Sequence, residues 1–135
     1  MRLCQDAGYH CLTSDDADAG AQNKLITFWI AFSMDSGLSL NFGKSPSLHD
    51  YDITASRPLF IEDRSNLVVL LCFVSAELAY LQGDVYKQLY SGQAQLETRS
   101  SKAQLAQALA VRTMSLRGEL LSVSISPPKW YRHRI

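Results

Sequence analysis

The spacing of apolar residues along this chain predicts a helical protein. Three segments, residues 21–40, 64–89 and 101–122, carry apolar residues at steps of three and four, which places them on one face of an α-helix. A shorter segment, residues 2–10, is expected to form a helix or a fragment of one. Residues 44–63 contain two prolines and no helical period, so we expect an ordered loop there. The expected fold class is therefore all-α, an irregular array of about four helices with one long ordered loop.

The second expected helix is the most aromatic part of the pattern. Its apolar stripe consists of five residues at helical spacing, Leu25, Phe28, Trp29, Phe32 and Ser36. Gly37 could bend or stop the helix, and Gly43 with Pro46 should end it. We expect the stripe to belong to the core. The alternative is a ligand pocket lined by Phe28, Trp29 and Phe32, because such pockets are rich in aromatic side chains.

The third and fourth expected helices differ in their apolar content. The first half of residues 64–89 is apolar on all sides, which indicates a helix buried between others. Its expected core face consists of Leu67, Leu70, Leu71, Val74, Leu78, Leu81 and Val85. A polar linker should begin at residues 91–93. The fourth helix has a narrower stripe, Leu105, Leu109, Leu116 and Leu120, together with Val111 or Met114.

Composition and charge limit the kinds of partner that the chain can have. The chain has 135 residues, 47% of them hydrophobic and 19% charged, which suits one globular domain. Thirteen basic and thirteen acidic residues give zero net charge, so no direct binding to nucleic acid is expected. Basic residues gather only in residues 127–135, as Lys129, Arg132 and Arg134, which we interpret as a solvated tail. The longest apolar run is too short to span a membrane.

The candidate chemical residues do not complete a site. Cys4, Cys11 and Cys72 are too few for a zinc cluster and odd in number for a disulfide framework. In the segment His49-Asp50-Tyr51-Asp52, the two carboxylates of an extended chain would point opposite ways. We expect one aspartate to cap or pair locally while Tyr51 or Ile53 packs inward.

Two further groups also favour structural roles. Asp35 is expected to pair with Arg57 or Lys44. Gly43-Lys44-Ser45 lacks the glycine-rich run and the strand of a phosphate-binding loop. The sequence therefore predicts no catalytic residue, no metal site and no cofactor, and the chain is not expected to be an enzyme.

The order of residues from the second helix into the loop resembles a known signature. A helix containing Phe-Trp, Asp and Leu-Ser-Leu, then a glycine, Asp-x-Asp-Ile and a proline, is similar to the regulatory ("middle homology") region of fungal zinc binuclear-cluster transcription factors. The matching residues are Phe28, Trp29, Asp35, Leu38, Ser39, Leu40, Gly43, Asp50, Asp52, Ile53 and Pro58. The chain departs from that pattern at Phe32, where the family has Tyr, and at Lys44-Ser45, where it has Arg-Pro.

This resemblance implies a nuclear protein that modulates RNA polymerase II transcription. Such regions follow the zinc-binding, DNA-contacting module and act through intramolecular contacts, partner proteins or small-molecule effectors. The zinc module has no counterpart in this chain, so residues 1–126 are expected to be a partial regulatory domain that is cut at both ends and binds no DNA itself. Two alternatives remain open, a self-standing helical interaction module and a small helical ligand-binding protein with a pocket beside Trp29.

Overall fold

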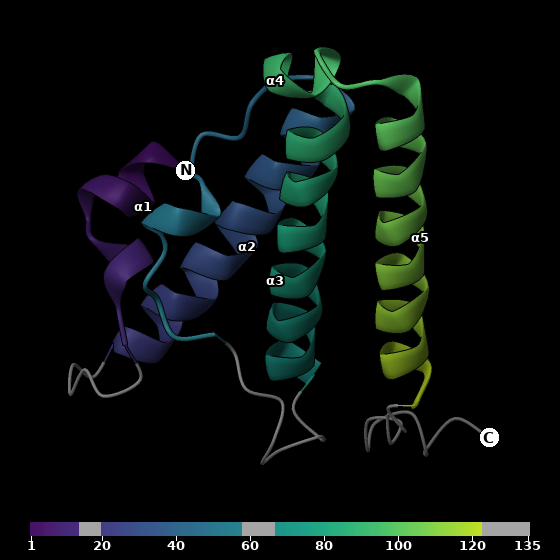
Figure 1. Ribbon diagram of the computed structural model, residues 1–135. Helices are drawn as coiled ribbons and strands as arrows, with labels where there is room; N and C mark the ends of the chain where they lie inside the picture. Colours follow the sequence, from purple (N-terminus) through teal and green to yellow (C-terminus); the bar gives the residue numbers. More distant parts are fainter. Residues whose placement is uncertain (14–19, 58–66, 123–135) are drawn as a thin grey trace.

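The fold is built entirely from helices (Figure 1). The computed structural model describes residues 1–13, 20–57 and 67–122, and this part of the chain contains no strand. The expected all-α class is confirmed. Two segments named in the sequence analysis lie outside the described residues. They are residues 58–66, which include Pro58 and the junction of the expected loop and third helix, and the tail at residues 127–135. The elements in order are α1 (Arg2–Asp6), the 3₁₀ turn η1 (Tyr9–Cys11), α2 (Ala21–Asn41), the 3₁₀ turn η2 (Asp50–Asp52), α3 (Leu67–Val85), the π-helical turn η3 (Tyr86–Tyr90), α4 (Gly92–Gln95) and α5 (Arg99–Ser122).

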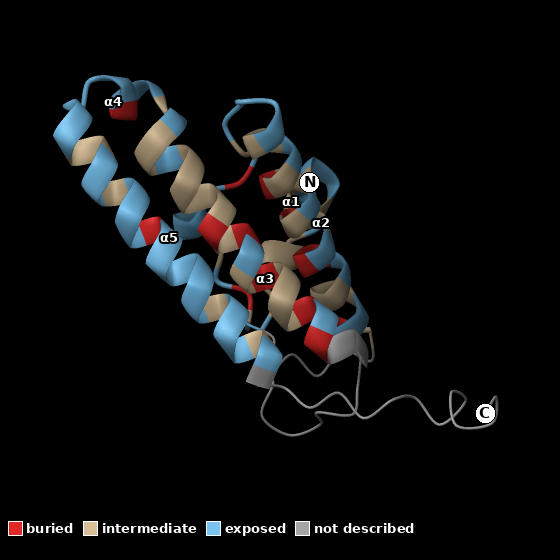
Figure 2. Cartoon of the chain, turned by 90° about the vertical axis from the view of Figure 1, so that its right-hand side faces the viewer, coloured by how far each residue is buried: buried red, intermediate tan, exposed pale blue. Residues whose placement is uncertain are grey.

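Helix α3 stands in the middle of the array. It packs against α2 on one side and α5 on the other, as predicted for a helix buried between others (Figure 1). The N-terminal turn η1 packs on α2, and the short helix α4 lies above α3 where the chain crosses to α5. In Figure 2, α5 lies at the front and most of its outer face is exposed. The core is therefore concentrated between α2 and α3.

Aromatic side chains of α2 form the centre of this core. Phe28, Trp29 and Phe32 are 0%, 1% and 3% exposed. The rings of Phe28 and Trp29 meet edge to face with their centroids 5.0 Å apart, and Phe32 meets Tyr80 of α3 in the same way at 5.5 Å. The indole Nε1–H of Trp29 donates a hydrogen bond to the carbonyl oxygen of Ser56 at 3.0 Å. The aromatic part of the stripe predicted on this helix is thus a packed core in which the indole N–H is satisfied.

On α3, small residues accompany Tyr80 on the face that meets these rings. Cys72, Ala76 and Ala79 are buried there, whereas Leu71 and Leu78 from the expected core face are 55% and 40% exposed. The expectation was wrong for those two leucines because large rings from α2 already fill the space, so α3 must offer small side chains to approach closely. On α5, Leu109 is buried but Val111 and Met114 are both exposed, because α5 packs mainly on α3 and η3 and its outer side faces solvent.

Helix α2 extends through Gly37 and ends at Asn41, one residue beyond the prediction. At Gly37 the glycine admits the side chain of Gln82 from α3, whose Nε2 would lie 3.4 Å from an added Cβ. The helix stops as predicted at Gly43, which takes a φ of +63°. The N–H of Lys44 donates a hydrogen bond to the carbonyl of Ser39 at 2.8 Å, and the N–H of Gly43 donates one to the carbonyl of Leu40 at 3.2 Å. This pair of hydrogen bonds is the Schellman motif.

Local endings account for the remaining differences from the prediction. The first helix is short because Gly8 adopts a φ of +74° and the chain restarts as η1. The polar linker expected from residue 91 instead contains α4, because the Ser91 hydroxyl accepts the N–H of Ala94 at 3.1 Å and caps a new turn. Helix α5 begins at Arg99 rather than at residue 101, and Thr98 caps it by accepting the N–H of Ser101 at 3.1 Å.

Replacing Trp29 with alanine should lower the free energy of unfolding by about 3–5 kcal/mol, because a fully buried aromatic side chain leaves a cavity and an unpaired carbonyl. Ile30→Ala is the matched control: Ile30 is the next residue of α2 and is 46% exposed, so its loss should have a much smaller effect. Urea titration followed by circular dichroism measures both. Equal effects at the two positions would contradict the packing described above.

Candidate functional site

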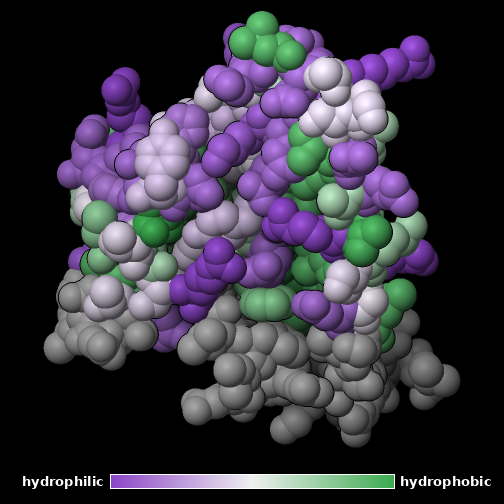
Figure 3. All heavy atoms as spheres, viewed as in Figure 1, coloured by the Kyte–Doolittle hydropathy of each residue, from purple (hydrophilic) through white to green (hydrophobic). Residues whose placement is uncertain are grey.

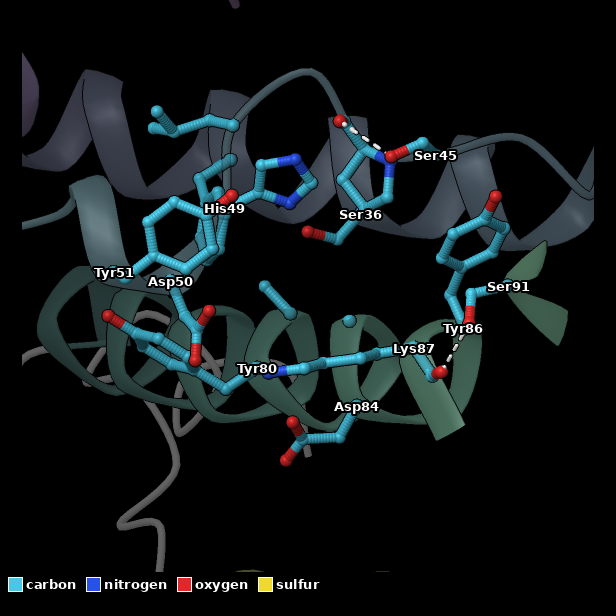
Figure 4. Close-up of a pocket in the computed structure, with 15 residues that line it drawn as sticks. Ser36, Ser45, His49, Asp50, Tyr51, Tyr80, Asp84, Tyr86, Lys87 and Ser91 are labelled. Carbon is cyan, nitrogen blue, oxygen red and sulfur yellow. Dashed lines mark hydrogen bonds between the residues drawn. The ribbon is translucent and has the colours of Figure 1, made fainter. Parts of the chain in front are cut away.

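A pocket between α2, the loop at residues 45–51 and the end of α3 is the candidate site (Figure 4). Its volume is about 240 Å³. The side chains around it come from segments that are far apart in the sequence, and the loop closes one wall. The chain brings these segments together because Leu48, which is 2% exposed, anchors the loop in the same core as the α2 rings.

The walls of the pocket are largely aromatic. Phe32 of α2, Tyr80 of α3, Tyr86 of η3 and Tyr51 of the loop all line it. Between the two helices the lining residues are small, namely Ser36, Ala79 and Gly83. An added Cβ at Gly83 would have no heavy atom within 4 Å. The pocket therefore exists because α2 and α3 carry little side-chain volume where they face it.

A buried hydroxyl group points into this space. Ser36 is 1% exposed, and its Oγ has no hydrogen-bond partner among the residues described. In Figure 4 the hydroxyl points into the gap between α2 and α3. Leaving a buried polar group unpaired costs on the order of 1–3 kcal/mol. Ser36 is thus a hydrogen-bonding group without a protein partner inside an aromatic pocket.

Charged groups lie at the edge of the pocket. Lys87 is exposed and extends along the mouth, while Asp84 points away and pairs with Arg112 of α5 (Figure 4). At the other end His49 stacks on Tyr51, with ring centroids 5.1 Å apart, beside the exposed Asp50. The charged side chains that line the pocket, Asp50, Asp84 and Lys87, thus lie at its edge, and none of them is buried.

Tyr80 separates this pocket from a more polar cleft. The guanidinium of Arg57 lies 4.1 Å from the centre of the Tyr80 ring and donates from Nη1 to Glu77 at 3.2 Å. Burial raises the pKa of the Tyr80 hydroxyl, and the nearby Arg57 charge offsets part of that rise. Tyr80 therefore stays protonated at neutral pH and contributes a neutral phenol to both cavities.

Several residues of the sequence signature join α2 to the following loop. Phe28 and Trp29 lie in the core, and Gly43 makes the turn. Both carboxylate oxygens of Asp35 accept hydrogen bonds from Ser47, at 2.8 Å from its N–H and 2.7 Å from its hydroxyl. The expected pairing of Asp35 with Arg57 is wrong, because Arg57 pairs with Glu77 and stacks on Tyr80; Ser47 holds the carboxylate in place of Arg57 or Lys44.

The remaining signature residues have mixed environments. Asp50 and Asp52 form a 3₁₀ turn, so the extended conformation expected for that segment is wrong. The turn replaces strand-like alternation because Asp52 N–H bonds back to His49. Tyr51 or Ile53 was expected to pack inward: Ile53 does so, and Tyr51 is 74% exposed. Leu38 is 52% exposed, whereas Ser39 and Leu40 are half-buried.

The predicted and observed pockets share only one residue. Of Phe28, Trp29 and Phe32, only Phe32 lines the space described here. Sequence reasoning missed Tyr80, Tyr86 and Gly83. A polar residue on an otherwise apolar stripe, as at Ser36, was the one available signal, since it places a hydroxyl on the core face. The π-helical turn that carries Tyr86 had no recognisable pattern.

Within the described part of the chain, the cysteines and the acidic residues do not gather into a metal site. Cys4 is half-buried, Cys11 is exposed and Cys72 is buried, and all three are free thiols. Burial raises the pKa of the Cys72 thiol, which keeps it protonated and unreactive. Within residues 1–13, 20–57 and 67–122, no three His, Cys, Asp or Glu side chains lie together where a metal ion would bind. None of the described helices has the length and apolar character needed to cross a bilayer.

Together, fold and site define a helical domain with a small aromatic pocket. Comparison with known proteins adds no relative: the chain matches no family model, no curated protein and no solved structure.

Removing the bond between Asp35 and Ser47 should loosen the loop that forms one pocket wall. Asp35→Ala removes both hydrogen bonds and should cost about 1–2 kcal/mol, whereas Ser47→Ala removes only the bond from the hydroxyl and should cost about 1 kcal/mol. The double mutant should cost less than the sum, because the hydroxyl bond is lost in both single variants. Chemical denaturation of the three variants gives this coupling energy. Ser45→Ala is the control, since Ser45 is exposed and its hydroxyl bonds to the carbonyl of the neighbouring Pro46 and not to Asp35. Additive effects would show that the two side chains act separately.

Proposed function

We propose that this chain is the helical regulatory part of a fungal zinc-cluster transcription factor and acts in the nucleus through protein contacts. The observation that carries the proposal is the ordered signature from Phe28 to Ile53. Its members form one structural unit: buried aromatic rings, a glycine turn, and a carboxylate that fixes the loop. A family signature that preserves architecture is expected to gather in this way.

An exposed apolar stripe on α2 supports a role in protein contacts. Ile30, Met34, Leu38 and Phe42 follow one another at steps of four residues and are 46%, 61%, 52% and 72% exposed. They lie away from the buried rings of the same helix. Figure 3 shows a different face, where polar residues dominate and apolar residues surface in narrow bands, one of them along the line where α3 and α5 meet. An exposed apolar stripe such as that of Ile30, Met34, Leu38 and Phe42 is typical of an interface.

The same stripe favours the second candidate, a self-standing helical interaction module. In that case α2 would dock a helix of another protein or of a second copy, without any link to a DNA-binding module. The two candidates share the docking surface and differ in what is covalently attached to the chain. Neither requires catalysis, zinc or direct contact with DNA.

A reporter assay tests the regulatory role. Inserted between an unrelated DNA-binding domain and an acidic activation domain in yeast, the chain should change reporter expression severalfold relative to a flexible linker of equal length. Met34→Asp with Leu38→Asp should abolish the effect, because charge on the stripe prevents apolar docking. Gln104→Asp with Gln107→Asp, at exposed positions of α5, is the matched control and should leave it unchanged. Expression that is indifferent to the inserted chain would contradict the proposal.

The proposal also predicts that the chain alone does not read DNA. Fluorescence anisotropy at near-physiological salt should show only weak, salt-sensitive association with any duplex, because the net charge is zero. Alanine at Lys129, Arg132 and Arg134 should remove what remains. Tight binding that discriminates between duplex sequences would overturn the assignment of DNA recognition to another module.

A further inference from the structure

We propose that the pocket between α2 and α3 binds a small, uncharged aromatic molecule with one hydrogen-bonding group, of the phenol or indole class. This inference does not depend on the proposed regulatory role, because it rests on the pocket alone. It names a ligand site and a ligand chemistry that the transcription-factor resemblance does not specify.

The first step is the size and shape of the space. The pocket measures about 240 Å³. An engineered apolar cavity of about 150 Å³ in another protein takes up benzene, so one or two fused rings fit here. Gly83 faces the open space where a larger residue would fill it. The tyrosine and phenylalanine rings of the wall offer edge-to-face or offset contacts, which an aromatic ligand can use fully.

The second step is the polarity of the interior. Ser36 supplies the one polar side chain that is buried and without a protein partner at this position. Its hydroxyl can both donate and accept, so it matches a phenol O–H or an indole N–H. Asp84 is paired with Arg112, and Lys87 remains exposed at the mouth. A charged ligand would have to leave water and would find no opposite charge in the buried part of the pocket. Carboxylates and amines are therefore excluded from that position.

The third step is the backbone at the open end. The chain leaves the α-helical ladder at η3, where residues Tyr86–Tyr90 form a π-helical turn. This turn changes the direction of the following side chains and places Tyr86 and Lys87 along the pocket. Isolated π-helical turns are frequent at functional sites, since they shift side chains at the expense of regular hydrogen bonding.

Titration of the full-length chain with phenol, indole, benzene and benzoate tests the proposal, with backbone amide NMR shifts as the readout. Phenol and indole should bind saturably and shift the amides of Ser36, Gly83 and Tyr86. Benzene should bind about five- to tenfold more weakly than phenol, because it lacks the hydrogen bond. Benzoate should not bind. No saturable shift with phenol or indole would overturn the proposal, and so would shifts that spread over the surface instead of the pocket.

Three variants at two positions test the residues. Ser36→Ala should keep benzene binding and remove the advantage of phenol, with thermal stability equal to or above that of the unmodified chain. An unchanged preference for phenol would show that Ser36 does not meet the ligand. Gly83→Leu should abolish binding by filling the pocket. Gly83→Ala places one methyl group in the same open space and favours the helix. It should weaken the binding of indole more than the binding of phenol. Binding unaltered by both Gly83 substitutions would overturn the site, while loss of reporter regulation with binding intact would affect only the proposed function.

Discussion

Trp29 connects the parts of the chain that regular secondary structure does not join. Its ring contacts Phe28 and Phe32 on α2 and lies 6.0 Å from Tyr80 of α3. An indole N–H in a dry core needs an acceptor, and the Ser56 carbonyl supplies it. The N–H of Ser56 in turn bonds to Leu12, so the N-terminal segment is tied to the same point. One buried side chain thus positions two helices, a loop and the start of the chain.

That constraint also explains why a pocket can persist in so small a protein. Leu48 and Ala55 bury the loop beside the aromatic rings, and Asp35 holds it at Ser47. The loop cannot collapse onto α3 without breaking these anchors. Between α2 and α3 the remaining space is lined by Ser36, Ala79 and Gly83, which are too small to fill it. A cavity in a core normally costs stability, and here the cost is tolerated because the surrounding contacts are fixed independently of it.

How much could be predicted from the sequence depended on the kind of interaction. Periodicity placed α2 and α5 within two residues of their ends, because burying one apolar face is the main requirement for such helices. On α3 it identified Leu70 and Leu81, which are buried, but it was wrong for the exposed Leu71 and Leu78. Ala76 and Ala79 meet α2 instead, since which face a nearly all-apolar helix presents depends on its neighbours. Asp35 could be assigned a loop partner but not the right one. A carboxylate satisfied by a backbone N–H and a hydroxyl has no charge pattern to reveal it.

The position of α5 at the edge of the array has a consequence for motion. It packs mainly on α3 and η3 and shares little of the aromatic core. Cooperative opening of a protein follows its contact density, so α5 forms a separate, weaker unit that can detach while α2 and α3 stay together. Each opening would break the pairing of Arg112 with Asp84, the residue next to Gly83 at the base of the pocket. The pocket is lined by residues of α2, the loop, α3 and η3 and by none of α5, so such an opening would leave its walls in place.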